Sequence, residues 1–336
     1  MKVHGSAEMA RTMFLQRQTA DTRTQLDRAG LELATGLKAD KYKATGGNLV
    51  RLFSLERMLE RNAVHTQSVS LTEMRLDFMQ ESLGRALGLA ERISVDLLAA
   101  VGLGDEVSAR AHSQAARRAF ADTVNLLNVQ VGGQALFAGD ATDRPALAPA
   151  ATILGQIEAA VAGAADVAEV IARVDAFFAG PDFREGAYLG SPDPLVPVEL
   201  GDGVRLDYAL MATQPEIVAA LKGHALAALV APGGSLAGSP PESRMEILGA
   251  AGRQLLGAKE DLLELRTRVG SAQESVEMAK ARRTGEREAF ELARARIVGA
   301  DPYDTASMFQ ALEAQLQTVF TVTARLSGMR FVNFLR

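Results

Sequence analysis

The stretch LGAAGRQLLGAKEDLLELRTRVGSAQESVEMA, residues 248–279, decides the fold of this chain. Its apolar residues recur at spacings of three and four, which places them on one stripe of an α-helix. The stripe runs through Leu248, Ala251, Leu255, Ala258, Leu262, Leu265, Val269, Ala272, Val276 and Ala279. Arg283 and Glu286 interrupt it, and it resumes in the same phase as far as Ile297. A helix of about 50 residues, where about 11–12 is usual, is stable only if its stripe is buried against other helices.

A matching pattern occupies the N-terminal third of the chain. Within residues 48–102, one stripe consists of Leu76, Met79, Leu83, Ala86, Ala90, Ile93, Leu97 and Ala100, and a second helix follows with Phe120, Val124, Leu127 and Val131. Gly102 and Gly104 are expected to end the first helix, and Asp105 to cap the next. An earlier stripe, Leu52 to Leu59, is out of phase and predicts a local change of winding. The patterns predict a mainly α protein whose N- and C-terminal segments form an elongated antiparallel helical bundle or coiled coil.

The centre of the chain has a different character, because ten of the eleven prolines lie between Pro145 and Pro241. Helical periodicity covers residues 153–178, and Pro215 is expected to open a helix that runs to about Val230. Between these helices, a Gly-Asp-Gly turn separates Val196, Val198 and Leu200 from Val204, Leu206 and Tyr208, which predicts a β-hairpin. We therefore expect an inserted central α+β domain at residues 141–241.

The stretch VGGQALFAGDATDRP, residues 131–145, joins the helices to this insert. Gly132 and Gly133 are expected to end the preceding helix, because glycine tolerates the left-handed geometry of a C-cap. Leu136 and Phe137 would then form the first strand of a hairpin that covers the bundle. The Gly-Asp pair at 139–140 would begin the turn toward the insert.

The two ends of the chain are amphipathic but too poor in large apolar residues to fold alone. We expect an N-terminal assembly helix at 1–41, the N-terminal part of the bundle with the hairpin start at 42–140, a C-terminal bundle helix at 242–299 and a C-terminal assembly helix at 300–336. The residues predicted to contact partner chains are Met9, Met13, Leu26, Leu33, Phe309, Leu312, Leu316, Val319, Leu326, Phe331, Phe334 and Leu335. The residues predicted to form the bundle core are Leu76, Leu83, Ile93, Leu97, Leu255, Leu262, Leu265 and Val269.

Composition and motifs argue against several classes of function. The net charge of −5 is spread over interspersed acidic and basic residues and does not favour binding to nucleic acid. The absence of cysteine excludes thiol catalysis, and the four histidines, His4, His65, His112 and His224, lack the spacing of metal ligands. Asp182, Glu185 and Asp193 lie in central loops, where solvated surface carboxylates are the default interpretation over a paired catalytic site. We therefore predict no enzyme activity, cofactor, metal or membrane contact.

Several motifs, taken in their order along the chain, carry a resemblance to a known family. A turn out of the first helix is formed by Thr35, Gly36, Leu37 and Lys38, and the helix-to-hairpin transition contains Gly133, Leu136, Phe137, Ala138 and Gly139. LRTRVGSAQESVE and the final stretch IVGADPYDTASMFQALEAQLQTVFTVTARLSGMRFVNFLR complete the set. The chain resembles the flagellin superfamily, and within it the hook–filament junction proteins, also called third hook-associated proteins. It departs from the family pattern at residues 42–49, YKATGGNL.

The resemblance implies a structural subunit of the bacterial flagellum that joins the hook to the filament. It implies an extracellular protein that is exported by the type III route without a cleaved signal peptide and assembles through its terminal helices. The partners implied are copies of itself, the adjoining hook-associated protein, flagellin or hook-cap-side subunits, and a flagellar export chaperone. Two alternatives stay open at this point: a flagellin filament subunit and, more remotely, an enzyme carried in the central insert.

Overall fold

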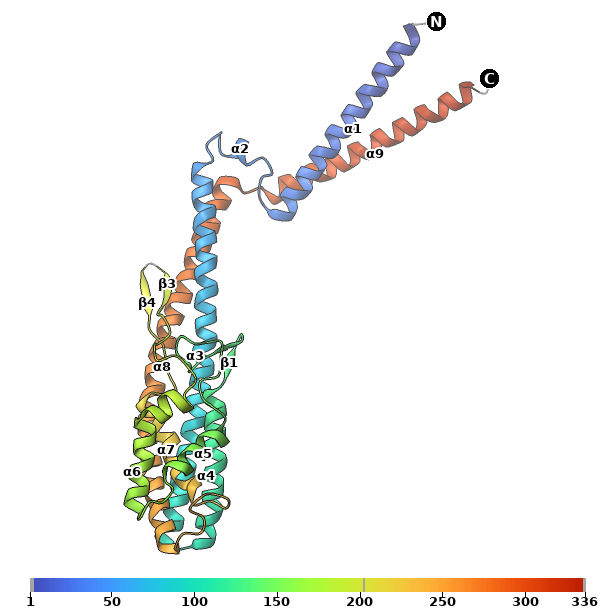
Figure 1. Ribbon diagram of the computed structural model, residues 1–336. Coiled ribbons are helices and arrows are strands. Elements are labelled where there is room, and N and C mark those ends of the chain that lie inside the picture. The colour runs from blue at the N-terminus through green and yellow to red at the C-terminus, as the bar shows by residue number, and fades with distance from the viewer. Residues whose placement is uncertain (1–2, 202, 335–336) are drawn as a thin grey trace. The chain divides into compact units, whose positions relative to one another are not determined.

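The computed structural model describes residues 3–201 and 203–334, without the side chains of residues 3–9, 11–12 and 326–334. Its described part is helical apart from short connections and two small hairpins, which confirms the predicted mainly α fold (Figure 1). In chain order the elements are α1 (Val3–Thr35), α2 (Lys41–Ala44), α3 (Val50–Leu103), α4 (Glu106–Leu127), β1 (Gln130–Val131), β2 (Gln134–Ala135), α5 (Ala150–Ala160), α6 (Val167–Ala179), the π-helix η1 (Asp182–Ala187), β3 (Val198–Gly201), β4 (Val204–Leu206), α7 (Pro215–Leu229), α8 (Pro241–Val298) and α9 (Pro302–Phe334).

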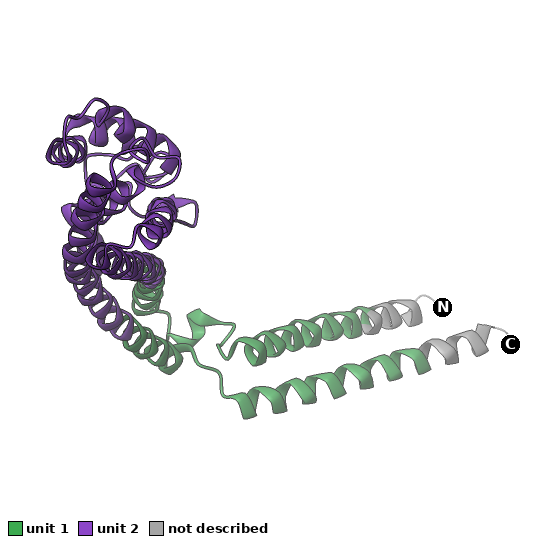
Figure 2. Ribbon diagram, turned by 90° about the horizontal axis from the view of Figure 1, so that it is seen from below, with its two compact units in different colours: residues 1–64, 283–336 green, residues 65–282 purple. Residues whose placement is uncertain are grey.

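The chain divides into two compact units (Figure 2). Unit 1 consists of residues 1–64 and 283–336, and unit 2 of residues 65–282. The helices α3 and α8 each continue from one unit into the other. The predicted insert, 141–241, lies inside unit 2, and the divisions at 64/65 and 282/283 are not among the predicted domain boundaries, which remain a proposal.

In unit 2, α3 and α8 run antiparallel and bury the two stripes that the sequence defines. Glu91 on α3 accepts a bond of 2.6 Å from Lys259 on α8, and further along Asp77 accepts one of 2.7 Å from Gln273. Residue numbers therefore fall along α3 in the direction in which they rise along α8, so the two helices are antiparallel. The apolar residues of both stripes from Leu76 to Ala100 and from Leu248 to Ala279 are buried.

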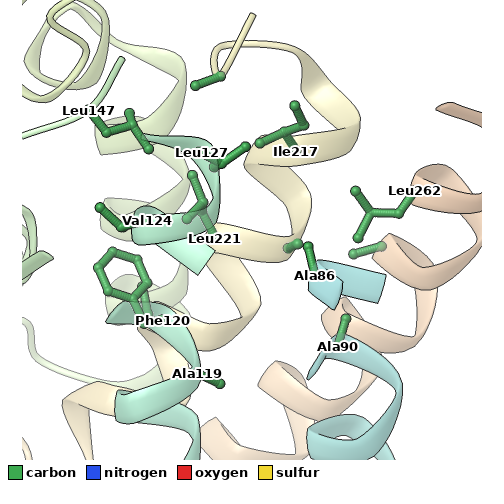
Figure 3. Packing of buried hydrophobic residues seen from close by; sticks show 14 of the residues in the cluster. Ala86, Ala90, Ala119, Phe120, Val124, Leu127, Leu147, Ile217, Leu221 and Leu262 are labelled. Atoms are coloured by element: carbon green, nitrogen blue, oxygen red, sulfur yellow. The ribbon is translucent and has the colours of Figure 1, made fainter. Parts of the chain in front are cut away.

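The helices α4 and α7 complete this core. Phe120, Val124 and Leu127 of α4 lie beside Ile217 and Leu221 of α7 in Figure 3, near the apolar faces of α3 and α8. The predicted helix from Pro215 is therefore present, and it is buried along nearly its whole length. A helix that is apolar on all sides is expected in the interior of a domain.

Two glycines allow the helices of unit 2 to approach closely. A Cβ atom on Gly223 of α7 would lie 2.6 Å from Cγ of Leu255 on α8. A Cβ atom on Gly252 of α8 would lie 2.8 Å from Cγ of Leu98 on α3. Such separations are shorter than van der Waals contact, so the interhelical distances depend on the absence of these side chains.

The structure corrects the role predicted for the glycine pair at 132–133. α4 ends earlier, at Leu127, and Asn128 caps it through its backbone N–H. Gly132 and Gly133 instead form the turn between β1 and β2, with φ angles of 60° and 77°. Two successive positive φ angles are the geometry of a type I′ hairpin turn, which glycine adopts without strain. The prediction that these glycines are left-handed was right, but they form a hairpin turn and not the helix end. The prediction that Leu136 and Phe137 form the first strand of this hairpin was wrong, because both residues follow its second strand, β2.

The predicted hairpin in the centre of the chain is present but shorter than expected. Val198 pairs with Leu206 and Gly201 with Val204, and the register shifts between Glu199 and Gly201. The helical region before it is divided into α5 and α6, since Asp166 caps a new helix by accepting a bond of 2.8 Å from the N–H of Glu169.

In unit 1, α1 and α9 pack against each other, and α1 ends where the sequence predicts. Gly36 follows it with a φ of 67°, and its carbonyl accepts a bond of 2.9 Å from the N–H of Ala300. The next residues bond to the end of α8, since the N–H of Lys38 donates to the carbonyl of Val298 at 2.7 Å. These two bonds join the segment that follows α1 to the end of α8 and the segment between α8 and α9.

Candidate assembly surfaces

The described part of the predicted C-terminal assembly stripe lies along α9 on the side that faces α1. Leu312 is buried, and Phe309, Leu316 and Val319 are half-buried within the single chain. Gly30 of α1 contributes to this packing, because a Cβ atom there would lie 3.3 Å from the ring of Phe309. This stripe is therefore largely used inside the chain, by pairing the two terminal helices.

The predicted N-terminal assembly residues lie at varied depths. Met13 and Leu33 of α1 are exposed, and Leu26 is half-buried. The predictions for Met9, Leu326, Phe331, Phe334 and Leu335 concern side chains that lie outside the described residues.

Large apolar side chains remain on the outer faces of α1 and α9. The exposed ones are Met13, Phe14, Leu31 and Leu33 on α1 and Tyr303, Met308, Phe320 and Val322 on α9. One of them is partly covered, since the guanidinium carbon of Arg23 lies 5.3 Å above the ring centroid of Phe320. A dense set of exposed apolar side chains on a thin pair of helices is typical of a surface that packs against other protein.

The eight residues predicted for the bundle core are all buried. They are Leu76, Leu83, Ile93, Leu97, Leu255, Leu262, Leu265 and Val269, and none is more than 3 % exposed. They are contributed by α3 and α8 within unit 2, where the two stripes meet.

A buried polar group occupies the position where the C-terminal stripe is interrupted. Arg283 is only 5 % exposed, and its Nη1 donates to Oε2 of Glu286 at 2.8 Å. Asn62 of α3 is also buried, and its Nδ2 donates to the Arg283 carbonyl and to Glu286 Oε2, both at 3.1 Å. The two helices therefore contact each other through polar groups at this level of unit 1.

The described histidines and the acidic residues of the central loops lie at separate places in the fold. His224 of α7 is fully buried, and this burial lowers its pKa to about 3, so it is neutral at physiological pH. His112 lies 3.6 Å from Asp96 at the surface. Asp182 and Glu185 belong to η1 and are exposed, as is Asp193. Within residues 3–201 and 203–334, no group of three or more His, Asp or Glu residues is placed to hold a metal ion.

A helix that spans a membrane needs about 20 consecutive, predominantly apolar residues. None of the described helices in residues 3–334 is both long and apolar enough to cross a bilayer.

The comparisons with known proteins agree with this architecture. Residues 255–335 match the family model described as the bacterial flagellin C-terminal helical region. The C-terminal part of the chain is therefore similar to bacterial flagellin. This confirms the resemblance to the flagellin superfamily that the sequence motifs indicated. None of the curated protein sequences matches this chain significantly.

Two solved structures share the fold. The crystal structure of Bacillus cereus FlgL aligns with a TM-score of 0.52 and 14 % identity, over 72 % of this chain and 100 % of that one. A putative flagellar hook-associated protein from Vibrio parahaemolyticus aligns with a TM-score of 0.51 and 14 % identity, over 74 % of this chain and 96 % of that one. The flagellin-like region therefore belongs to a chain with a FlgL-like fold.

Some features of these surfaces carried no clear signal in the sequence. Arg23 and Phe320 are almost 300 residues apart, and Gly30 is an unremarkable glycine within a helix. The interruption at Arg283 was visible in the sequence, but its partner Asn62 was not, because no periodicity links an isolated asparagine to a distant helix.

Proposed function

We propose that this chain is a structural subunit of the bacterial flagellum that joins the hook to the flagellin filament. The observation that carries the proposal is the alignment of a complete FlgL chain with 72 % of this one. FlgL is the third hook-associated protein, the family that the sequence motifs resemble. The flagellin-like region at residues 255–335 supports a position next to flagellin, because related helices can continue the packing of a neighbouring layer.

Assembly through the terminal helices accounts for the composition of unit 1. Each fully buried Leu or Phe contributes about 1.5–3 kcal/mol, whereas ordering the backbone costs about 1–2 kcal/mol per residue. Among its described side chains, the pair α1 and α9 buries few large ones by itself and leaves Phe14, Leu31 and Phe320 exposed. Contacts with neighbouring subunits would bury these residues, and the free energy gained would offset the cost of ordering the two helices.

The assembly role can be tested at Leu316, which is half-buried on α9. Leu316→Asp places a charge among apolar side chains and is expected to block assembly while unit 2 stays folded. Gln315→Asp, on an exposed neighbouring position, is the matched control and should assemble normally. Global unfolding of the Leu316→Asp monomer, measured by circular dichroism, would contradict the assignment.

The remaining parts of the proposal follow from the same family. The partners are copies of this chain, the adjoining hook-associated protein, flagellin or hook-cap-side subunits, and an export chaperone. The location is the extracellular flagellum, reached by type III export without a cleaved signal. The role is structural and not enzymatic.

A filament subunit is the second candidate, because the matched family model describes flagellin itself. Deletion of the gene in the source bacterium, with microscopy and a blot of the medium for the major flagellin, distinguishes the two. Hooks without filaments, with flagellin shed into the medium, support the junction role. Loss of filaments with no flagellin in the medium supports the filament subunit. Intact, motile flagella would contradict both in a strain without a second copy of the gene.

A further inference from the structure

The helix α3 carries a second stripe on its outer side in unit 2. Leu71, Met74, Phe78 and Val95 are between 40 % and 59 % exposed. Together with residues 81, 85, 88 and 92 they follow the same alternation of three and four as the buried stripe, in another phase. A 3,4 pattern is typical of a surface that receives a helix.

This stripe leads into a groove between α3 and α4. The groove has a volume of about 590 Å³ and is lined by Arg85, Gly88, Leu89, Arg92, Asp122, Asn125, Leu126 and Val129. A Cβ atom on Gly88 would meet nothing within 4 Å, so the floor is open. Arg85 pairs with Glu81 on the same helix. Arg92 has no ion-pair partner in the part of the chain that the structure describes.

The outer side of α8 carries exposed apolar side chains beside acidic ones, which complement the apolar and basic side chains of the α3 surface. Leu256 and Leu263 are 45 % and 52 % exposed, and the acidic residues beside them, Glu260 and Glu264, are exposed as well. Asp261 lies in the same turn, and its partial burial together with the charges of nearby Glu216, Glu260 and Glu264 raises its pKa. Glu216 is paired with Arg268 at 2.9 Å, whereas Glu260 and Glu264 have no ion-pair partner among the described residues, so negative charge is left at this surface.

These two surfaces lie at the same height along unit 2. The bond from Lys259 to Glu91 and the contact of Gly84 with Arg266 place residues 84–91 of α3 alongside residues 259–266 of α8. Arg85 and Arg92 therefore bracket the level of Glu260 and Glu264. Because the two surfaces belong to different helices, one molecule can present both at once.

We propose that the outer surface of α3 and the α3–α4 groove receive the outer surface of α8 from a second copy of this chain. This inference rests on the proposed function as a self-assembling subunit. Copies related by rotation about an axis parallel to the helices keep the same height, so Arg85 and Arg92 of one copy face Glu264 and Glu260 of the next. The contact joins two different surfaces, so it is heterologous and repeats around a ring. Charge complementarity selects this occupant over an unrelated helix.

The absence of cysteine makes the contact directly testable by disulfide trapping. Full-length Gly88→Cys and Leu263→Cys proteins are purified, mixed at high concentration and low salt, and oxidised. Mixtures of Gly88→Cys with Ala151→Cys, on the exposed start of α5, are the matched control. We expect at least about tenfold more cross-linked heterodimer from the first mixture than from the control. Equal yields, or a preference of Gly88→Cys for itself, would overturn the proposal.

Charge exchange gives the second measurement. Arg85→Glu/Arg92→Glu in the first protein, or Glu260→Arg/Glu264→Arg in the second, should each lower the cross-linking yield about tenfold. Mixing the two reversed proteins should restore it, which a loss of folding could not do. Arg184→Glu on η1 is the control and should leave the yield unchanged. Failure of the reversed pair to restore cross-linking would contradict the pairing.

The two proposals can fail separately. The flagellar phenotype of the deletion reports on the function, and the cross-link reports on the surface. In a strain whose flagella assemble from the Gly88→Cys/Leu263→Cys double variant, oxidation should give a ladder of multimers of this chain. Normal flagella without a ladder would refute the surface alone. Capture of a different protein by Cys at position 88 would assign the groove to another partner and refute this pairing.

Discussion

The two units differ in what their interiors are made of (Figure 2). In the described residues of unit 1, the buried apolar side chains are Ala29, Leu52, Val298 and Leu312, and they are matched in number by the buried polar ones, Thr22, Asn62, Arg283 and Thr305. Unit 2 instead has one continuous apolar cluster that extends over all its long helices. Unit 2 therefore has the interior of an independent domain, whereas the described residues of unit 1 form only a small apolar interior, which agrees with the assembly role proposed for it.

The largest expected difference between the units is in the effect of replacing a buried leucine by alanine. Leu97→Ala in unit 2 should lower the free energy of unfolding by about 2–5 kcal/mol, because Leu97 is completely buried. Leu312→Ala in unit 1 should leave the main transition unchanged and speed amide exchange only in α1 and α9. Urea unfolding and hydrogen exchange measured by mass spectrometry distinguish the two. Equal amide protection of both units in the native chain would break the comparison.

A second prediction concerns the buried polar group of unit 1. Replacing Asn62, Arg283 and Glu286 together by Leu should stabilise unit 1 by about 1–4 kcal/mol, since apolar packing then replaces a buried guanidinium and its half-buried carboxylate partner, which are costly to desolvate. Slower amide exchange in residues 283–298 is the readout. The exposed pair Arg287 and Glu291, 3.6 Å apart, is the control, and its replacement by Leu should not slow exchange there. Faster exchange in the triple variant would show that the polar group supports unit 1.

The third prediction concerns His224, whose ring nitrogens have no hydrogen-bond partner among the described residues. Burial lowers its pKa from 6.5 to about 3, so between these values the unfolded chain binds a proton that the folded chain does not. As the pH is lowered below 6.5, the free energy of unfolding of unit 2 should therefore decrease by about 1.4 kcal/mol for each pH unit. By pH 5 the loss is about 2 kcal/mol.

His224→Leu should remove this part of the pH dependence and stabilise unit 2 at neutral pH, because it also removes two unsatisfied polar atoms. His65→Leu, at a half-buried position of α3, is the control and should retain the slope. Urea unfolding at pH 5, 6 and 7 provides the measurement. An unchanged slope in the His224→Leu variant would contradict the assignment.

The smallest effect is expected from the close approach of α7 and α8. Gly223→Ala should destabilise unit 2 by a net of about 1 kcal/mol, because the overpacking of the new methyl group against Leu255 costs about 1–3 kcal/mol and the gain in helix propensity returns about 1 kcal/mol. Gly257→Ala on the open side of α8 is the matched control and should stabilise the helix. The midpoint of thermal unfolding should fall for Gly223→Ala and rise for Gly257→Ala. Equal changes in the two variants would show that unit 2 can accommodate the additional methyl group between α7 and α8.

Much of the fold could be predicted from the sequence because helical periodicity is a local property. The alternation of apolar residues in 248–279 and 76–100 identifies the sides of α8 and α3 that are buried, and Gly104 and Asp105 mark the boundary between α3 and α4. The role of Gly132 and Gly133 was not predictable in the same way. A left-handed glycine pair suits a helix end and a hairpin turn equally, and the strands that distinguish them are only two residues long.

The candidate surfaces were predictable only in part. Apolar stripes on α9 and α3 can be read from the sequence, but a stripe does not state what covers it. Only the structure shows that Phe309 and Leu312 are used against α1, and that Leu71, Met74 and Phe78 remain exposed.

The sequence by itself determined the long helices, the antiparallel pairing of the N- and C-terminal segments and the flagellin-like motifs. The tertiary structure decided which residues far apart in the chain share an interior and which stay at the surface. The physical reason is that a helix requires only bonds within four residues, whereas burial depends on every element that packs nearby. For that reason the thin interior of unit 1 and the exposed surfaces of α3 and α8 became visible only in three dimensions.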